Sequence, residues 1–303
     1  MANKILLETG TNEMELLAVI VDGQYFGMNV AKVQSIQQFD PRKVTGMPRS
    51  AESIIGVLSY RKKSIPVIDL AQILGKESSP KDSKDIVVIT EFNNTINSFK
   101  VHGVNQIYRI SWDRLTPLKG IMSNNSYVTG SVLIDDKEIL VLDLEYILAT
   151  LFPELTLEDV SDDTVAEQKS MHRDNIKIYF AEDSAIIRTG VAKALAKSGY
   201  ANITEFENGK MAFDYFMALK NGDQDGLQNS VLISDIEMPV MDGLTLCKNL
   251  KSDPDLQELH ITMFSSLINR QMIEKCKSVG ADNYVTKPEV NKLVHILDDF
   301  FER

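Results

Sequence analysis

The stretch VLISDIEMPVMDG, from Val231 to Gly243, decides the fold of the carboxyl-terminal half. An apolar run leads directly into Asp235, and a segment containing Pro, Asp and Gly follows, which is typical of a buried strand that ends in a tight loop. In open parallel sheets, ligands bind beyond the carboxyl ends of the strands. Asp235 is therefore the first candidate functional residue.

Other apolar runs around this stretch alternate with amphipathic segments. Between the first two, Ile187, Val191 and Leu195 mark one helical face and Gly199 provides a stop signal. This alternation predicts an α/β fold with a doubly wound, five-stranded parallel sheet of the flavodoxin-like kind. The predicted strands are 177–181, 203–206, 231–234, 260–264 and 283–285.

Polar side chains collect at the carboxyl ends of these strands. Clustered carboxylates repel one another unless a cation joins them, and oxygen ligands suit Mg²⁺. A metal, an amine and a hydroxyl around a carboxylate nucleophile would serve phosphoryl transfer, with Asp235 as the nucleophile. The residues concerned are Glu182 and Asp183 after the first strand, Asp235 after the third, Ser265 after the fourth, and Tyr284 and Lys287 at the fifth.

Each of these residues taken alone also fits an ordinary role. Glu182 and Asp183 could stabilise the N-terminus of the helix that follows them. Ser265 could be an ordinary serine at a strand end, Lys287 a solvated lysine, and Tyr284 a core ring with an exposed hydroxyl. Their order on successive strands favours the functional interpretation.

The amino-terminal half has a different pattern, with short β-rich runs separated by Gly, Asn, Asp and Pro, which predicts an all-β barrel or sandwich. The predicted strands are 16–21, 24–28, 54–60, 64–68, 86–91, 98–101, 131–134 and 138–142. Residues 65–74 match residues 139–148, 74 positions later, and Gly56 and Gly130 obey the same offset. In each copy an Asp after the strand can cap a short helix. Two similar half-barrels would explain the match.

Bulk properties limit the function further. A chain of 303 residues suits two domains, and the net charge of −11 argues against binding to nucleic acid. No apolar run is long enough to span a bilayer and no signal peptide is recognisable, so we expect a cytoplasmic protein without direct membrane insertion. Cys247 and Cys276 match no metal or redox spacing and are expected to be plain buried or half-buried thiols.

The strand-end residues resemble the response-regulator receiver family along the whole carboxyl-terminal half. The resemblance implies that Asp235 accepts a phosphoryl group and that Mg²⁺ lies among Asp183, Glu182, Asp235 and the backbone carbonyl of Glu237. It also implies that Ser265, Tyr284 and Lys287 form the switch and the phosphoryl contact. Two departures from the family are the carboxylate of Glu237 and Ser266, where smaller or uncharged residues are common.

The amino-terminal half resembles the CheW-like coupling domain, through Val57–Arg61, Ile65–Leu70, Tyr25–Val30 and Lys100–Val104. Lys62 departs from the usual Gly, and Arg61 is either a solvated turn residue or a weak candidate for partner contact. The whole chain resembles the CheV type of chemotaxis protein, with a coupling domain at 13–152, an acidic linker at 153–174 and a receiver at 175–303. That architecture implies an adaptor, not an enzyme, which couples chemoreceptors in receptor arrays to the histidine kinase CheA and receives phosphate from it.

Three other functions remain open at this stage. The receiver could be a phosphate sink that drains CheA. A haloacid-dehalogenase-like phosphatase would also use Asp and Mg²⁺, but its nucleophile follows the first strand, whereas Asp235 follows the third. A transcription regulator would need a DNA-binding domain, for which the β-rich half offers no basic recognition helix.

Overall fold

A computed structural model describes residues 10–48, 51–78, 84–118, 127–152, 173–222 and 227–301. The chain forms two compact units, one of residues 14–155 and one of residues 1–13 with 156–303. Residues 153–172 of the predicted linker lie outside the described residues, and the predicted domain boundaries stay predictions.

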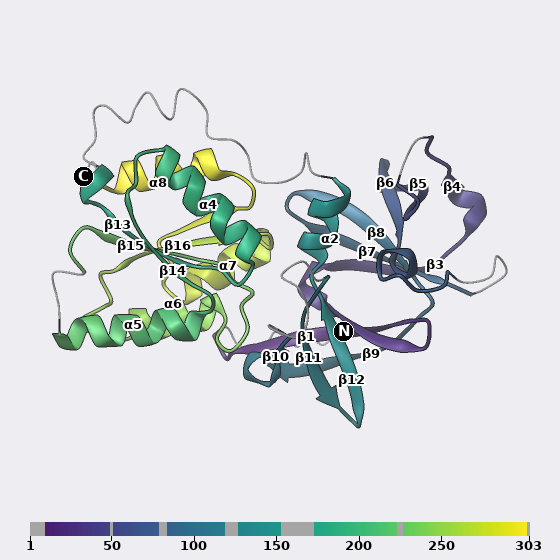
Figure 1. The fold of residues 1–303 in the computed structure, drawn as a ribbon, viewed down its shortest axis with the longest axis horizontal. Helices are drawn as coiled ribbons and strands as arrows, with labels where there is room; N and C mark the ends of the chain where they lie inside the picture. The colour runs from purple at the N-terminus through teal and green to yellow at the C-terminus, as the bar shows by residue number, and fades with distance from the viewer. Residues whose placement is uncertain are drawn as a thin grey trace. The chain divides into compact units, whose positions relative to one another are not determined.

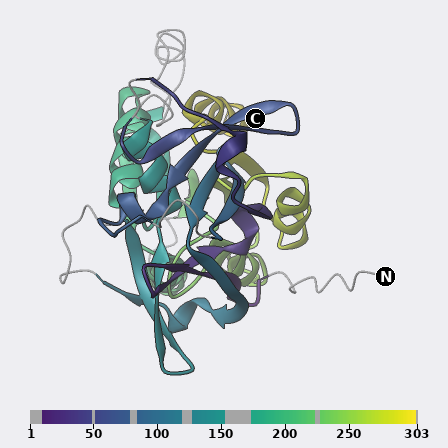
Figure 2. The same cartoon turned by 90° about the vertical axis from the view of Figure 1, so that its right-hand side faces the viewer.

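The unit of residues 14–155 consists of two six-stranded sheets (Figures 1 and 2), in the orders β10-β11-β12-β2-β1-β9 and β3-β7-β8-β6-β5-β4. Most neighbouring strands are antiparallel, while β12 with β2 and β6 with β8 are parallel. The prediction of an all-β half is confirmed. The elements are β1 (Glu13–Val21), β2 (Gln24–Asn29), β3 (Val33–Gln38), β4 (Val44–Thr45), β5 (Ile54–Tyr60), β6 (Lys63–Asp69), α1 (Leu70–Ile73), β7 (Ile86–Phe92), β8 (Thr95–Val101), β9 (Gly103–Ser111), β10 (Thr116–Pro117), β11 (Val128–Ile134), β12 (Lys137–Leu142) and α2 (Leu144–Leu151), with the 3₁₀ turns η1 (Val30–Lys32), η2 (Pro41–Lys43) and η3 (Trp112–Arg114).

The predicted internal repeat is confirmed by the strand pairing. The β5–β6–α1 unit and the β11–β12–α2 unit have the same order, and both hairpins carry a register irregularity just before a glycine, Gly56 or Gly130. A Cβ at Gly56 would lie 2.3 Å from the Thr45 carbonyl oxygen, and one at Gly130 would lie 2.7 Å from that of Thr116. Both glycines are therefore required because the short neighbouring strand passes too close for a side chain.

Four strands of this unit were not predicted from the sequence. In β3 and β9 most side chains are exposed or half-buried, and β4 and β10 are only two residues long. Such strands carry little of the apolar alternation on which strand prediction depends. The central core lies between the two sheets and is formed by residues that include Val19, Met28, Phe99 and Ile147.

The other unit contains the five-stranded parallel sheet, in the order β14-β13-β15-β16-β17. Helices α4 and α8 pack on one face, whereas α5, α6 and α7 pack on the other (Figure 1). The prediction of a flavodoxin-like α/β sheet is confirmed. The elements are η6 (Arg173–Asn175), β13 (Lys177–Ala181), α4 (Ala185–Lys197), β14 (Asn202–Phe206), α5 (Gly209–Gly222), β15 (Ser230–Ser234), α6 (Gly243–Lys251), β16 (His260–Ser265), α7 (Arg270–Ser278), β17 (Asn283–Thr286) and α8 (Val290–Phe301).

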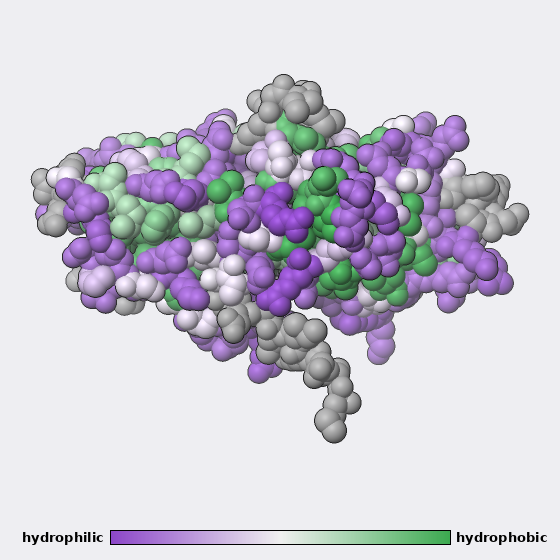
Figure 3. All heavy atoms as spheres, turned by 90° about the horizontal axis from the view of Figure 1, so that it is seen from below, coloured by the Kyte–Doolittle hydropathy of each residue, from purple (hydrophilic) through white to green (hydrophobic). Residues whose placement is uncertain are grey.

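Hydrophilic side chains predominate on the face drawn in Figure 3, with smaller hydrophobic patches among them. Within the described ranges, no helix is long and apolar enough to cross a bilayer. Cys247 and Cys276 are buried free thiols, as predicted, and burial raises the pKa of each to about 12. Among the described residues, the large apolar side chains that remain exposed are Ile36, Met47, Ile107, Leu133, Ile186, Met211, Tyr215 and Val240.

Candidate functional site

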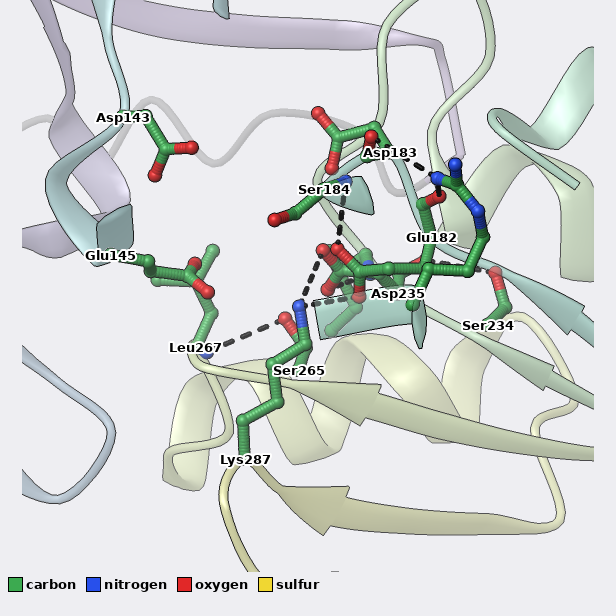
Figure 4. A network of polar contacts seen from close by, with 12 residues as sticks. Asp143, Glu145, Glu182, Asp183, Ser184, Ser234, Asp235, Ser265, Leu267 and Lys287 are labelled. Carbon is green, nitrogen blue, oxygen red and sulfur yellow. Dashed lines mark hydrogen bonds and ion pairs between the residues drawn. The ribbon is translucent and has the colours of Figure 1, made fainter. Parts of the chain in front are cut away.

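Three carboxylates meet at the carboxyl edge of the parallel sheet. Glu182 and Asp183 follow β13, and Asp235 follows the neighbouring strand β15. One oxygen from each of the three lies within 4.8 Å of the others. Because parallel strands end at the same edge, adjacent strands bring Asp235 close to acids that precede it by 52 and 53 residues (Figure 4).

Lys287, from the segment after β17, points into this carboxylate cluster. Its Nζ lies 2.7 Å from Glu182 Oε2 and 3.0 Å from Asp235 Oδ2. The lysine side chain is buried, and the Lys287–Pro288 peptide bond is cis. The ammonium therefore bridges two of the three acids, and Figure 4 shows it between them and Ser265.

Burial strongly perturbs the site. The pKa of Glu182 is raised well above its ordinary value, first because the carboxyl is desolvated and then because Asp235 and Asp183 are close; Lys287 opposes this shift. A second cation beside these acids would remove the remaining repulsion. The side chains present, oxygen ligands of high charge density, fit a hard divalent ion such as Mg²⁺.

The backbone around Asp235 fixes the direction of its carboxylate. The Ile236 amide donates to Asp235 Oδ1 at 2.6 Å, and the Gly243 amide donates to the Ile236 carbonyl at 3.0 Å. A Cβ on Gly243 would lie 1.9 Å from the Asp235 carbonyl oxygen, so only glycine fits there. The loop in the stretch Val231–Gly243 is thus closed tightly over the end of β15.

Arg188 and Ser184 also shape the site, although sequence reasoning did not single them out. Arg188 Nη1 donates to the carbonyls of Glu182, at 2.6 Å, and Asp183, at 3.3 Å. The Ser184 amide donates to Glu182 Oε1 at 3.1 Å. Arg188 lies one turn into α4, and an arginine at such a helical position gives no signal that distinguishes it from a solvated one.

The other two predicted switch residues, Ser265 and Tyr284, form no described hydrogen bond with these carboxylates. Ser265 ends β16, is fully buried, and its Oγ accepts a hydrogen bond from the Leu267 amide at 3.4 Å. Tyr284 in β17 is half-buried and packs against the core on the α5–α7 side. Their roles in switching stay predictions.

Three other residues singled out in the sequence occupy different surroundings. Glu237 is half-buried in the loop after Asp235, and Ser266 is buried next to Ser265. Arg61 lies in the other unit, in the exposed β5–β6 turn, where its guanidinium carbon is 5.0 Å from the centre of the Tyr60 ring. That stacking agrees with a turn residue and does not test partner contact.

Comparison with known proteins identifies the class of protein to which this chain belongs. The family model described as CheW-like domain matches residues 15–152, and the model described as response regulator receiver domain matches residues 178–298. The first range covers the unit with the two six-stranded sheets, and the second covers the unit with the five-stranded parallel sheet. The chain is therefore a two-domain signalling protein with a CheW-like unit and a receiver.

Relatives that span both domains narrow the class to a family. Chemotaxis protein CheV3 of Helicobacter pylori is 32% identical over 320 residues, covering 100% of this chain and 99% of the relative. Chemotaxis protein CheV2 of the same organism is 25% identical over 288 residues, covering 91% and 90%. The crystal structure of the scaffolding protein TtCheW from Thermoanaerobacter tengcongensis is 22% identical, covers 43% of this chain and 88% of its own, and has a TM-score of 0.40. The chain belongs to the CheV family of chemotaxis proteins.

Proposed function

We propose that this protein is an adaptor which couples chemoreceptors to the histidine kinase CheA, and that Mg²⁺-dependent phosphorylation of Asp235 modulates the coupling. The CheW-like unit would contact kinase and receptors at receptor arrays, on the cytoplasmic side of the membrane, with Arg61 as a weak candidate contact. The receiver would take its phosphoryl group from a CheA phosphohistidine. Membership in the CheV family supports the general role.

One observation carries the proposal about the site: Lys287 bridges the buried carboxylates of Glu182 and Asp235, and the half-buried Asp183 lies in the same cluster. The single positive charge of Lys287 can balance only one of the three carboxylates. Here two carboxylates share one ammonium, and Asp183 adds a third negative charge. This surplus negative charge is what a divalent cation would neutralise.

The residues have distinct roles in the proposed transfer. An oxygen of Asp235 forms a bond to phosphorus as the phosphorus–nitrogen bond of the donor histidine breaks, and the imidazole leaves. Asp183, Asp235 and the Glu237 carbonyl would hold Mg²⁺, with Glu182 as the other member of the acidic pair beside Asp183. The bound ion would neutralise charge on the phosphoryl group. The Ile236 amide and Lys287 orient the acceptor carboxylate before the reaction.

After transfer, the phosphoryl oxygens would compete for Lys287 and for the Ser265 hydroxyl. Ser265 ends β16 and the Lys287 amide donates to the Ser265 carbonyl at 3.2 Å, so a shift in one strand end is passed to the other. Tyr284 on β17 would then change its packing. A partner that distinguishes these two states would respond to phosphorylation.

The decisive test is transfer of radiolabelled phosphate from phospho-CheA to the purified protein with Mg²⁺. Label should reach the wild type and be absent from Asp235→Asn and from samples with EDTA. Asp214→Asn, which removes an exposed carboxylate on α5, is the matched control and should be labelled normally. Equal labelling of Asp235→Asn and wild type would refute the assignment of the acceptor.

The sink alternative is separated by a second assay. Kinase output in reconstituted receptor arrays is measured with Asp235→Ala in place of wild type. A change in coupling supports modulation. Unchanged coupling together with slower loss of phosphate from CheA would instead assign the receiver as a phosphate sink.

A further inference from the structure

The loop after the phosphoacceptor is held by a residue from the far end of the chain. Residues 10–13 belong to the same compact unit as the receiver, although they precede the CheW-like unit in sequence. In that unit, Asn12 contacts the segment between β15 and α6. No sequence pattern predicts this contact, because 223 residues separate Asn12 from Asp235.

Asn12 makes two hydrogen bonds to this segment and one to the first turn of α6. The backbone amide of Asn12 donates to Thr245 Oγ1 at 2.9 Å. Its side-chain Nδ2 donates to the Val240 carbonyl at 2.8 Å, and its Oδ1 accepts from the Asp242 backbone amide at 3.0 Å. The side chain therefore bonds the backbone on both sides of Met241. Gly10 supports the same arrangement, since a Cβ there would lie 2.7 Å from the Lys248 side chain.

The contacted loop has a conformation that needs support. Val240 has φ +68°, a left-handed conformation that is unfavourable for a β-branched residue, and 37% of its surface is exposed. Core packing at Val240 is therefore incomplete. The hydrogen bond from Asn12 to the Val240 carbonyl holds this residue in place.

A short series of hydrogen bonds connects Asn12 with the acceptor. Asp242, bonded by Asn12, is followed by Gly243, whose amide donates to the Ile236 carbonyl at 3.0 Å. The Ile236 amide in turn donates to Asp235 Oδ1 at 2.6 Å. Loosening the Asn12 contact would therefore release the loop that fixes the carboxylate.

We propose that Asn12 is a positioning residue for the phosphoacceptor loop, which holds Asp235 and the residues after it in the arrangement that binds Mg²⁺. This inference rests on the proposed function of the receiver. It adds a residue outside the receiver sequence to the machinery of that site.

The test compares Asn12→Gly with wild type in the full-length chain. Glycine keeps the left-handed backbone of Asn12, φ +58°, without strain, so only the side-chain bonds are lost. Asn229→Gly is the matched control, because Asn229 also has positive φ, +50°, but lies at the opposite end of β15. Mg²⁺ binding is measured by calorimetric titration, and exchange of the Asp242 amide is measured by hydrogen-exchange NMR.

We expect Asn12→Gly to weaken Mg²⁺ binding roughly fivefold or more, the usual range for coupled sites, and Asn229→Gly to leave it unchanged. The Asp242 amide should exchange about tenfold faster in Asn12→Gly, and adding Mg²⁺ should slow its exchange in wild type. The positioning role would be overturned if Asn12→Gly and Asn229→Gly bound Mg²⁺ equally well. It would also be overturned if the exchange rate of the Asp242 amide changed neither in Asn12→Gly nor on addition of Mg²⁺. Wild type that binds no Mg²⁺ would refute the proposed receiver chemistry itself.

Discussion

Lys287 lies 2.7 Å from a Glu182 oxygen and 3.0 Å from an Asp235 oxygen, with Asp183 as a third acid in the same cluster. Acids gathered in a buried site destabilise the metal-free fold, because each charge is desolvated and repelled by its neighbours. The same repulsion increases affinity for a cation. Stability and metal binding should therefore respond in opposite directions to loss of one acid.

Asp235→Asn should show this opposition. In EDTA, the variant should have a free energy of unfolding about 1 kcal/mol higher than wild type, because one of three neighbouring negative charges is removed. In excess Mg²⁺ the order should reverse, since the variant has lost a ligand. Urea denaturation with and without EDTA measures both values, and an Asp235→Asn variant less stable than wild type in EDTA would contradict the argument.

The raised pKa of Glu182 predicts a pH dependence. The folded state holds this proton more tightly than the unfolded chain, so the contribution of Glu182 to stability is present below the ordinary pKa and is lost as pH rises through the raised one. As pH rises from the ordinary pKa of a glutamate through the raised pKa of Glu182, metal-free wild type should therefore lose stability relative to Glu182→Gln. Denaturation midpoints in EDTA across pH 4 to 8 check this, and parallel curves for the two proteins would exclude Glu182 as the cause.

At this scale, the residues predicted from the sequence are those whose position follows from strand order. Glu182, Asp183, Asp235 and Lys287 each stand at a strand end, and the parallel sheet brings strand ends together. Arg188 and Asn12 could not be found in this way. Their contacts depend on how a helix and a distant segment pack, and neither residue type is unusual at its position.

The β5–β6 hairpin turn of the CheW-like unit contains two residues with positive φ. Arg61 and Lys62, which join β5 and β6, have φ values of +47° and +66°. Two-residue hairpin turns of this kind favour Asn or Asp followed by Gly, as Asp22-Gly23 provides between β1 and β2. Lys62 is thus a strained residue in an otherwise regular hairpin.

Lys62→Gly should stabilise the CheW-like unit by about 1 kcal/mol, the usual cost of a left-handed conformation for a residue with a side chain. The reverse change, Gly23→Lys, should destabilise it by a similar amount, because nothing lies within 4 Å of a Cβ at Gly23 and only the backbone angle changes. Chemical denaturation of both variants provides the comparison. Destabilisation by Lys62→Gly would mean that the lysine side chain makes a compensating contact.

The segment before β13 is fixed by a buried ion pair. Arg173 in η6 is 1% exposed; it binds Asp298 of α8 through two nitrogens and donates to the Ser198 carbonyl at 2.6 Å. The Tyr200 hydroxyl also donates to Asp298, at 2.6 Å. The sequence places Arg173 in an acidic linker, so its burial became apparent only from the fold.

Arg173→Met should destabilise the receiver by about 3 kcal/mol, because the Asp298 carboxylate would remain buried without its partner. Arg270→Met, which changes an exposed arginine at the start of α7, serves as the control and should have little effect. Thermal unfolding of both variants measures the difference. Equal midpoints would show that water or Tyr200 compensates for the lost guanidinium.

At the scale of the whole molecule, sequence periodicity was sufficient for both fold classes but not for every element. The 74-residue repeat predicted matching hairpins, and both ends of every predicted receiver strand lie within one residue of the observed end. Strands β3 and β9 escaped prediction because their partners in the sheet, rather than their own side chains, determine their conformation. The family relationship explains why two such different patterns occur in one chain.

Two compact units in one chain predict two unfolding events with different sensitivity to metal. A ligand stabilises only the unit that binds it, and at one hundred times its dissociation constant the gain is about 2.7 kcal/mol, or several degrees in Tm. Mg²⁺ should therefore raise one calorimetric transition and leave the other unchanged. Asp235→Asn should abolish the shift.

Trp112 identifies the transitions, because it is the single tryptophan of the chain and lies buried in the CheW-like unit. Its fluorescence should follow the transition that Mg²⁺ does not move. A shift of the Trp112 signal with Mg²⁺ would mean that the two units unfold together, since metal bound at Asp235 would then stabilise strands to which it has no bond. In that case phosphorylation of the receiver would also change the stability of the CheW-like unit.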